Sequence, residues 1–215
     1  GIRDTDRSRW LGDVYKRQIS ATSKFSFILI YIPAVLIVVN AQWILNVWLT
    51  EVPAYTVRFC QLITICCMID AMTGPYNCAI LATGRIKRYQ LALSLSCLLD
   101  VMLCFTILKL GVSANYVLYS RILTRGIINM FIGLHFMEVL LDFRIIEYCR
   151  KVILPVLCFL LLHLPFLIVG SRFYEGWQWF WISGIYVLTF GGLGALFIIL
   201  RKEERRYLFR LVLRK

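Results

Sequence analysis

Two arginines, Arg121 and Arg125, are the residues of this sequence best suited to bind an anion. They stand one helical turn apart in the stretch YSRILTRG, inside a long apolar run. Arginine keeps its charge in proteins, and a separation of four residues places both guanidinium groups on one face of a helix. A guanidinium offers a planar fork of donors to phosphate oxygens, so the pair is a candidate substrate-binding site for an anion.

Two carboxylates, Asp70 and Asp100, also lie inside apolar runs. Insertion scales put the cost of each such charge at about 2.5–3.5 kcal/mol at the centre of a membrane helix, so these side chains must face protein or water. Asp70 and Asp100 are therefore candidate intramembrane charge partners of the arginines. Two other interpretations stay open: purely structural pairing, and snorkelling to the membrane surface, which suits Arg121 better than the deeper Arg125.

The segment TGPYN, residues 73–77, carries a further signal. Pro75 lacks a backbone N–H and clashes with the preceding turn of a helix, so we expect a helix break at Gly74 and Pro75. Such a break beside intramembrane charge is typical of transport sites, and also of packing kinks. The glycines near the C-terminal end of the last apolar run indicate close helix packing.

The overall composition explains why these charges are unusual. Of 215 residues, 60% are hydrophobic and 17% charged, whereas a soluble domain has roughly 45–50% apolar and about 25% charged residues. This excess indicates that a bilayer is the solvent. The net charge of +12 would suggest nucleic acid in a soluble protein. Because the cations fall between apolar runs, we expect no nucleic-acid partner.

The residue types that commonly perform catalysis or bind metals are not arranged in this sequence as a catalytic or metal-binding site would require. The eight cysteines and the two histidines show no zinc-like spacing, so we interpret them as packing residues, without a metal or cofactor. The sequence has no Ser/His/Asp grouping, no Gly-rich phosphate loop and no acidic metal cluster. We therefore expect that the chain is not an enzyme. The cysteines and histidines interpreted as packing residues are Cys60, Cys66, Cys67, Cys78, Cys97, Cys104, Cys149, Cys158, His135 and His163.

The first 18 residues, GIRDTDRSRWLGDVYKRQ, differ from the rest. They have no apolar period, and WLGDVYKRQ resembles translated sequencing-adapter sequence. We predict that residues 1–18 are an artefactual segment and that the natural chain extends further upstream; a native cytoplasmic tail is the alternative.

The remaining chain predicts an all-α integral membrane protein. Residues 19–200 contain six apolar runs of the roughly 20 residues needed to cross a bilayer, joined by short connections that make neighbouring helices antiparallel. Residues 201–215 form a basic tail that can lie on anionic membrane lipids. The predicted spans are residues 25–49, 56–82, 91–110, 115–140, 152–170 and 177–200.

The orientation follows from the distribution of lysine and arginine. Fourteen cations lie at one set of span ends, including the seven of the tail, and only Arg58, Lys109 and Arg172 lie at the other. The positive-inside rule therefore places both ends of this chain in the cytoplasm. Five tryptophans at the opposite ends are typical of an interfacial belt: Trp43, Trp48, Trp177, Trp179 and Trp181.

Several junction motifs resemble a known family. They are WLTEVPAY (48–55), IDAMTGPYNCAILATGRIKRYQ (69–90), LKLG (108–111), VILP (152–155) and EERRYLF (203–209). Together, and in this order, they resemble the C-terminal half of bacterial lipid-linked oligosaccharide flippases. These flippases belong to the superfamily that includes multidrug exporters and the lipid II flippase.

The resemblance implies a two-lobe, alternating-access transporter of which this chain is most of one lobe, the N-terminal lobe being absent. It implies a bacterial plasma-membrane protein that flips isoprenoid-pyrophosphate-linked oligosaccharide units for surface polysaccharide or lipopolysaccharide biosynthesis. In that family, cationic cavity residues are thought to meet the pyrophosphate. A cation-coupled multidrug exporter of the same superfamily is the alternative, and a membrane glycosyltransferase or polymerase a more distant one.

Overall fold

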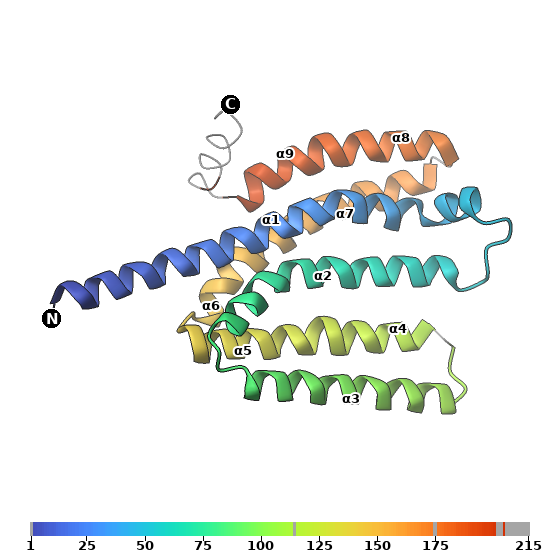
Figure 1. The fold of residues 1–215 in the computed structure, drawn as a ribbon. Helices are drawn as coiled ribbons and strands as arrows, with labels where there is room; N and C mark the ends of the chain where they lie inside the picture. Colours follow the sequence, from blue (N-terminus) through green and yellow to red (C-terminus); the bar gives the residue numbers. More distant parts are fainter. Residues whose placement is uncertain (1, 114, 174–175, 201–203, 205–215) are drawn as a thin grey trace.

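The computed structural model describes residues 2–113, 115–173, 176–200 and 204, apart from the side chains of residues 2–11, 13, 170–173 and 196. Every regular element in this part of the chain is helical, and no strand occurs in it (Figure 1). The α-helices are α1 (Ile2–Trp48), α2 (Thr56–Ala82), α3 (Lys87–Lys109), α4 (Asn115–Arg121), α5 (Asn129–Leu141), α6 (Ile145–Tyr148), α7 (Leu154–Phe173), α8 (Gly176–Tyr186) and α9 (Gly192–Gly194). Four π-helical segments continue them: η1 (Ile122–Ile128), η2 (Cys149–Ile153), η3 (Val187–Gly191) and η4 (Ala195–Ile199).

Six helical segments are long and apolar enough to cross a membrane, which confirms the prediction of an all-α membrane protein with six spans. Their bounds lie close to the predicted ones, except at the first and fifth spans, which start earlier than expected. The segments are Val14–Trp48, Thr56–Ala82, Lys87–Lys109, Asn115–Leu141, Ile145–Val169 and Gly176–Ile199. The π-helical segments were not expected from the sequence.

Helix α1 extends back to Ile2, so residues 2–13 continue the helix beyond the start of the first span at Val14. Lys16 and Ile19, which follow these residues, contact the rest of the fold. Lys16 forms an ion pair of 3.9 Å with Asp142, and Ile19 is buried in the core. The chain reverses at Asp142, which has the left-handed φ of +49° at the end of α5.

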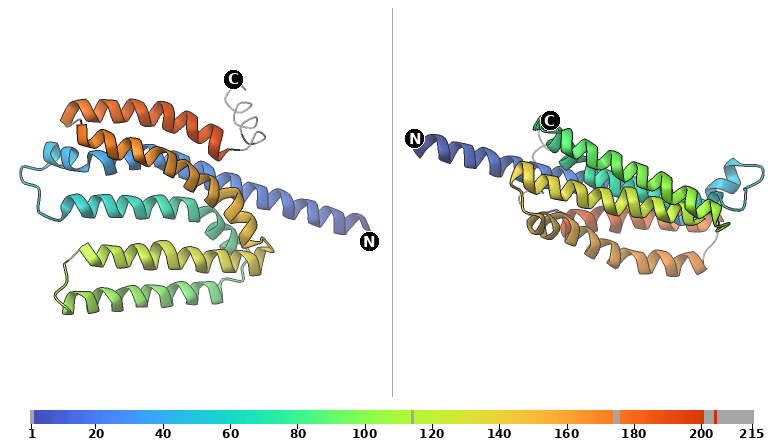
Figure 2. Two further views of the ribbon diagram at one scale, coloured as in Figure 1. Left: turned by 180° about the vertical axis from the view of Figure 1, so that it is seen from behind. Right: turned by 90° about the horizontal axis from the view of Figure 1, so that it is seen from below.

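Consecutive spans run antiparallel, so the molecule has two ends (Figures 1 and 2). One end, which we call the terminal end, is the end from which the N-terminal part of α1 projects (Figure 1). It carries the turns at residues 83–86 and 142–144 and the end of η4. The opposite end carries the connections around residues 49–55 and 110–114. Helices α1 and α2 pack side by side at the centre, α3 with α4–α5 flanks α2, and α7 with α8–η4 flanks α1.

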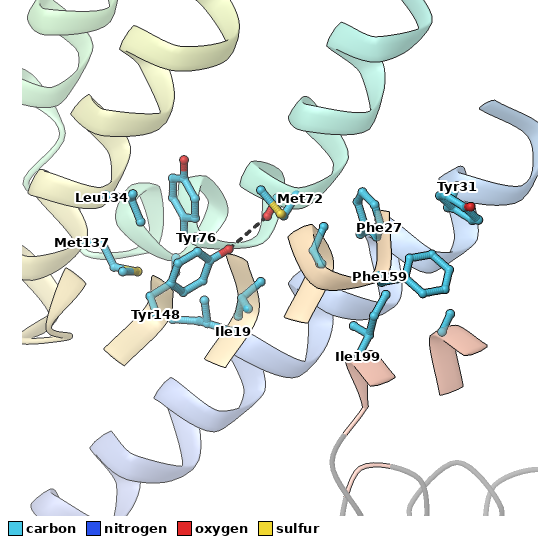
Figure 3. Close-up of a cluster of buried hydrophobic side chains, with 14 of the residues drawn as sticks. Ile19, Phe27, Tyr31, Met72, Tyr76, Leu134, Met137, Tyr148, Phe159 and Ile199 are labelled. Carbon is cyan, nitrogen blue, oxygen red and sulfur yellow. Dashed lines mark hydrogen bonds between the residues drawn. The ribbon is translucent and has the colours of Figure 1, made fainter. Parts of the chain in front are cut away.

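The hydrophobic core lies mainly toward the terminal end. Tyr76 of α2 and Tyr148 of α6 meet edge to face with ring centroids 5.6 Å apart, among Ile19, Leu134 and Met137 (Figure 3). The Tyr148 hydroxyl donates a 3.2 Å hydrogen bond to the Met72 carbonyl oxygen. Further core residues are Phe27, Tyr31, Ile80, Tyr89, Phe143, Val152, Phe159, Val187 and Ile199.

Small residues bring the helices of this core together. A Cβ atom added to Gly133 of α5 would overlap the Tyr76 ring. At Gly191 it would lie 3.2 Å from the Tyr31 ring, and at Gly194 it would lie 3.2 Å from Nε2 of His163. The close packing expected from the glycines near the C-terminal end of the last span is therefore present at Gly191 and Gly194.

One ion pair links the first span to the end of the chain. Lys24 of α1 is 1% exposed, and its Nζ lies 3.0 and 2.9 Å from the two carboxylate oxygens of Glu204. Apart from Glu204, the predicted basic tail of residues 201–215 lies outside the described residues. Burial explains the pairing, because an unpaired ammonium group inside protein is costly.

Aromatic side chains gather at the opposite end. Trp43 and Trp177 lie with ring centroids 4.9 Å apart, while Trp48, Trp177 and Trp181 are 78%, 62% and 59% exposed. These exposed indoles fit the predicted interfacial belt. Trp179 does not, because it is 4% exposed and packs inside the bundle.

Candidate functional site

The two arginines of the sequence prediction lie on the fourth span, where its hydrogen bonding changes from α to π. Arg121 is the last residue of α4, and Arg125 lies within η1. Both side chains are exposed. Arg125 lies about 15 Å along the helix from Asn115, where the span begins, at a rise of about 1.5 Å per residue, so its exposed charge lies deep within the span. Short π-helical segments occur frequently at functional sites.

A small pocket of about 200 Å³ brings Arg125 together with Asp70. Three spans build it, because Asp70 comes from α2, Ser96 and Cys97 come from α3, and Asn129 follows η1 on α5. The Asn129 Oδ1 atom is buried without a hydrogen-bond partner in the described part of the chain. A buried acceptor beside a guanidinium group indicates that water or a ligand completes this pocket.

Asp70 and Arg125 share this pocket without forming an ion pair of 4.0 Å or less in the described part of the chain. Both charges remain open to further partners. Cys66 precedes Asp70 by one helical turn on α2, and Arg121 precedes Arg125 by one turn on the fourth span, so each lies on the same helix face as a residue of the pocket. We call the set Cys66, Asp70, Ser96, Cys97, Arg121, Arg125 and Asn129 the polar site.

Asp100, the other predicted charge partner, has a different neighbour. It is 8% exposed, and its Oδ1 accepts a 2.6 Å hydrogen bond from the Thr124 hydroxyl, rather than bonding to an arginine. Thr124 is fully buried and belongs to η1, as Arg125 does. Asp100 therefore links α3 to the helix that carries the arginines through Thr124. The expected direct pairing of Asp100 with an arginine is not seen in the described part of the chain.

The expected break at Gly74 and Pro75 takes the form of a bend inside one continuous helix. Helix α2 runs unbroken to Ala82 and changes direction near its C-terminal end (Figure 1). Two hydroxyl groups bond to backbone carbonyl oxygens just before Pro75: Thr73 donates to that of Asp70 at 3.2 Å, and Tyr148 donates to that of Met72. The neighbouring residue Asn77 accepts a 2.6 Å hydrogen bond from Tyr89 of α3.

Sequence reasoning missed the uncharged polar residues of the spans. Thr124, Ser96 and Asn129 stand in or beside the polar site, yet each is uncharged and lies in a mostly apolar stretch. A second buried pair was also missed: Asn40 of α1 donates a 3.0 Å hydrogen bond to the Ser183 hydroxyl of α8. Reading every Ser, Thr and Asn of the spans as a possible inter-helix contact would have found these positions.

The comparisons with known proteins add no relative. No protein-family model matches the chain, and no curated protein or solved structure matches it either. What the chain does must therefore be argued from the polar site and from the junction motifs of the sequence.

Proposed function

We propose that this chain is one lobe of a bacterial membrane transporter that flips isoprenoid-pyrophosphate-linked oligosaccharides across the plasma membrane. The observation that carries the proposal is the exposure of Asp70, Arg121 and Arg125 at membrane depth. Each charge would cost about 2.5–3.5 kcal/mol if it faced lipid at a helix centre. The polar site therefore faces water or another part of the transporter, as the wall of a translocation cavity does.

The charges of the polar site favour an anionic substrate. Two guanidinium groups stand against one exposed carboxylate, because Asp100 is buried and bonded to Thr124. Guanidinium groups bind phosphate oxygens in a bidentate manner. The identity of the phosphate compound, an isoprenoid-linked sugar pyrophosphate, rests on the resemblance of the junction motifs to flippases.

The two alternatives fit the site less well. A cation-coupled drug exporter would favour acidic and aromatic residues around its substrate, whereas the polar site has an excess of positive charge. A glycosyltransferase or polymerase would need an extramembrane loop with catalytic residues, and the connections between the described helices are short.

The test is surface-polysaccharide export in a flippase-deleted host that carries the intact transporter. Arg125→Gln is expected to reach the membrane at the normal level and to lose export, because a neutral amide cannot replace the charged fork. Arg125→Lys is expected to retain part of the export, and Arg121→Gln most of it. Arg85→Gln, in an exposed turn at the terminal end, is the matched control and is expected to export normally.

Full export from the Arg121→Gln/Arg125→Gln double variant would contradict the proposal and make both arginines structural. Membrane protein level must be measured alongside export. A variant that is absent from the membrane reports on folding, and Arg125→Lys then provides the test of function.

A further inference from the structure

An apolar slot separate from the pocket of the polar site opens among four spans of the bundle. Its volume is about 630 Å³, and α1, α2, α7 and the η1–α5 segment line it. Gln61 is the one polar side chain of the lining, and its amide already donates a 2.8 Å hydrogen bond to the Val38 carbonyl oxygen. Apart from Gln61, the lining is therefore apolar along its length.

The slot has a buried floor and an open rim. Phe27, Met72 and Val156 of the floor are between 3% and 8% exposed. Along the rim, exposed side chains include Ile65 at 36%, Ile127 at 41%, Leu157 at 49%, Leu164 at 45% and Ile168 at 56%. A slot with these walls, set within membrane-spanning helices, opens toward hydrocarbon rather than toward water.

The length of the slot along α2 is close to the thickness of one leaflet. Along α2 it extends from Gln61 to Met72, about 17 Å, and along η2–α7 from Ile153 to Ile168, about 22 Å, at a rise of about 1.5 Å per residue. The hydrocarbon of one leaflet is about 15 Å thick, half of a core of about 30 Å. The slot begins near the opposite end of α2 and ends just past the middle of that helix.

A cation stands where a lipid headgroup would lie. Arg58 is exposed and precedes Gln61 by three residues, so it lies on the same face of α2, about 4.5 Å nearer the opposite end. Arg58 and Lys109 are the two cations of the opposite end with described side chains. The ammonium group of Lys109 lies 5.1 Å from the centre of its neighbour, the Phe105 ring, away from the slot.

We propose that this slot binds a glycerophospholipid of the leaflet at the opposite end, with an acyl chain between α2 and α7 and the phosphate at Arg58. The apolar lining accounts for the chain, the length accounts for a single leaflet, and Arg58 accounts for the charged group. The site does not depend on the proposed transport function. The bound acyl chain would fill a space whose apolar side chains otherwise lack packing partners.

Native mass spectrometry of the full chain in mild detergent, titrated with phosphatidylglycerol, tests the site. The unmodified protein is expected to retain one lipid. Arg58→Gln is expected to weaken binding by about five-fold, since one basic side chain near a lipid surface contributes about 1 kcal/mol. Leu157→Trp is expected to abolish binding by filling the slot, with Ile65→Trp as a second slot-filling variant from α2.

Matched controls separate the slot from the rest of the surface. Leu161 lies on the same helix as Leu157, is 69% exposed and lies outside the slot. The variant Leu161→Trp should therefore keep the lipid. Lys109→Gln removes the other cation and should also keep it. Retention of the lipid by both slot-filling variants overturns the proposal. So does binding of a polyprenyl phosphate with exclusion of phosphatidylglycerol, which would assign the slot to another lipid.

Discussion

The two halves of this bundle are built differently. Toward the terminal end, aromatic rings and glycines close the spaces between several helices, as Tyr76 against Gly133 and Tyr31 against Gly191 show. An open groove of about 840 Å³ remains there between α1 and α2, beside Ile19. The middle and the opposite half contain the pocket at Asp70 and Arg125 and the apolar slot. The buried polar contacts of this half, Thr124 to Asp100 and Asn40 to Ser183, hold helices together around open space.

We propose that the difference separates stability from function in the chain. Close packing around Tyr31 and Tyr76 fixes the helices, so the open half can keep charged side chains that would destabilise a compact core. Helix α2 belongs to both halves. Its residues Met72, Tyr76 and Ile80 are buried, whereas Asp70, less than one turn before Met72, is exposed.

The largest effect is expected from Gly133→Ala. The added methyl group overlaps the Tyr76 ring at the α2–α5 contact, and overpacking of a core costs about 1–3 kcal/mol or more. The variant should lose a large part of its thermal stability in detergent, followed by fluorescence-detected size exclusion. Gly192→Ala is the control, because no atom lies within 4 Å of the added Cβ. Equal loss in both variants would show that the terminal half is not closely packed.

A smaller effect is expected from Thr124→Val in the open half. It removes the donor to the buried Asp100 carboxylate, and an unsatisfied buried group costs about 1–3 kcal/mol. Thr106→Val, which removes an exposed hydroxyl bonded to its own helix, should be close to neutral. The double variant Asp100→Leu/Thr124→Val should recover much of the lost stability, since it removes both polar partners. Additive losses in the double variant would argue against the contact.

The smallest effect is expected from Tyr148→Phe. The ring stays in the core, but its hydrogen bond to the Met72 carbonyl oxygen is lost, at a cost of about 1 kcal/mol. Tyr116→Phe serves as the control, because Tyr116 is 54% exposed. A thermal midpoint of Tyr148→Phe equal to that of the control would show that this hydroxyl does not support the bend of α2.

The number and approximate bounds of the spans were readable from the sequence because each is a long apolar run. The sharing of one pocket by Asp70 and Arg125 was foreseen only in outline, from the rule that intramembrane charges avoid lipid. Which helix faces meet depends on packing between spans distant in sequence. Asp100 bonds to Thr124, which the sequence did not mark as a partner because Thr124 is uncharged.

The backbone details show the same limit. Proline marks a bend in α2, but the sequence does not show that the hydroxyl of Tyr148, from another span, bonds to the Met72 carbonyl oxygen beside that bend. Nothing in the sequence around residues 122–128 announces a π-helical segment, since its side chains suit an α-helix equally well. Gly133 is one glycine among thirteen, and only its position opposite Tyr76 makes it critical for packing.

Two native cysteines provide the most direct test of the central claim, that the polar site faces water rather than lipid. Cys97 lies in the pocket with Asp70 and Arg125, and Cys158 lies exposed on α7, outside that pocket and outside the apolar slot. Thiosulfonate reagents attack the thiolate, which forms in water and not in hydrocarbon. In membranes that contain the protein with one of these cysteines retained, modification of Cys97 and not of Cys158 by a charged thiosulfonate is expected. An unreactive Cys97, or equal rates at the two positions, would contradict the account.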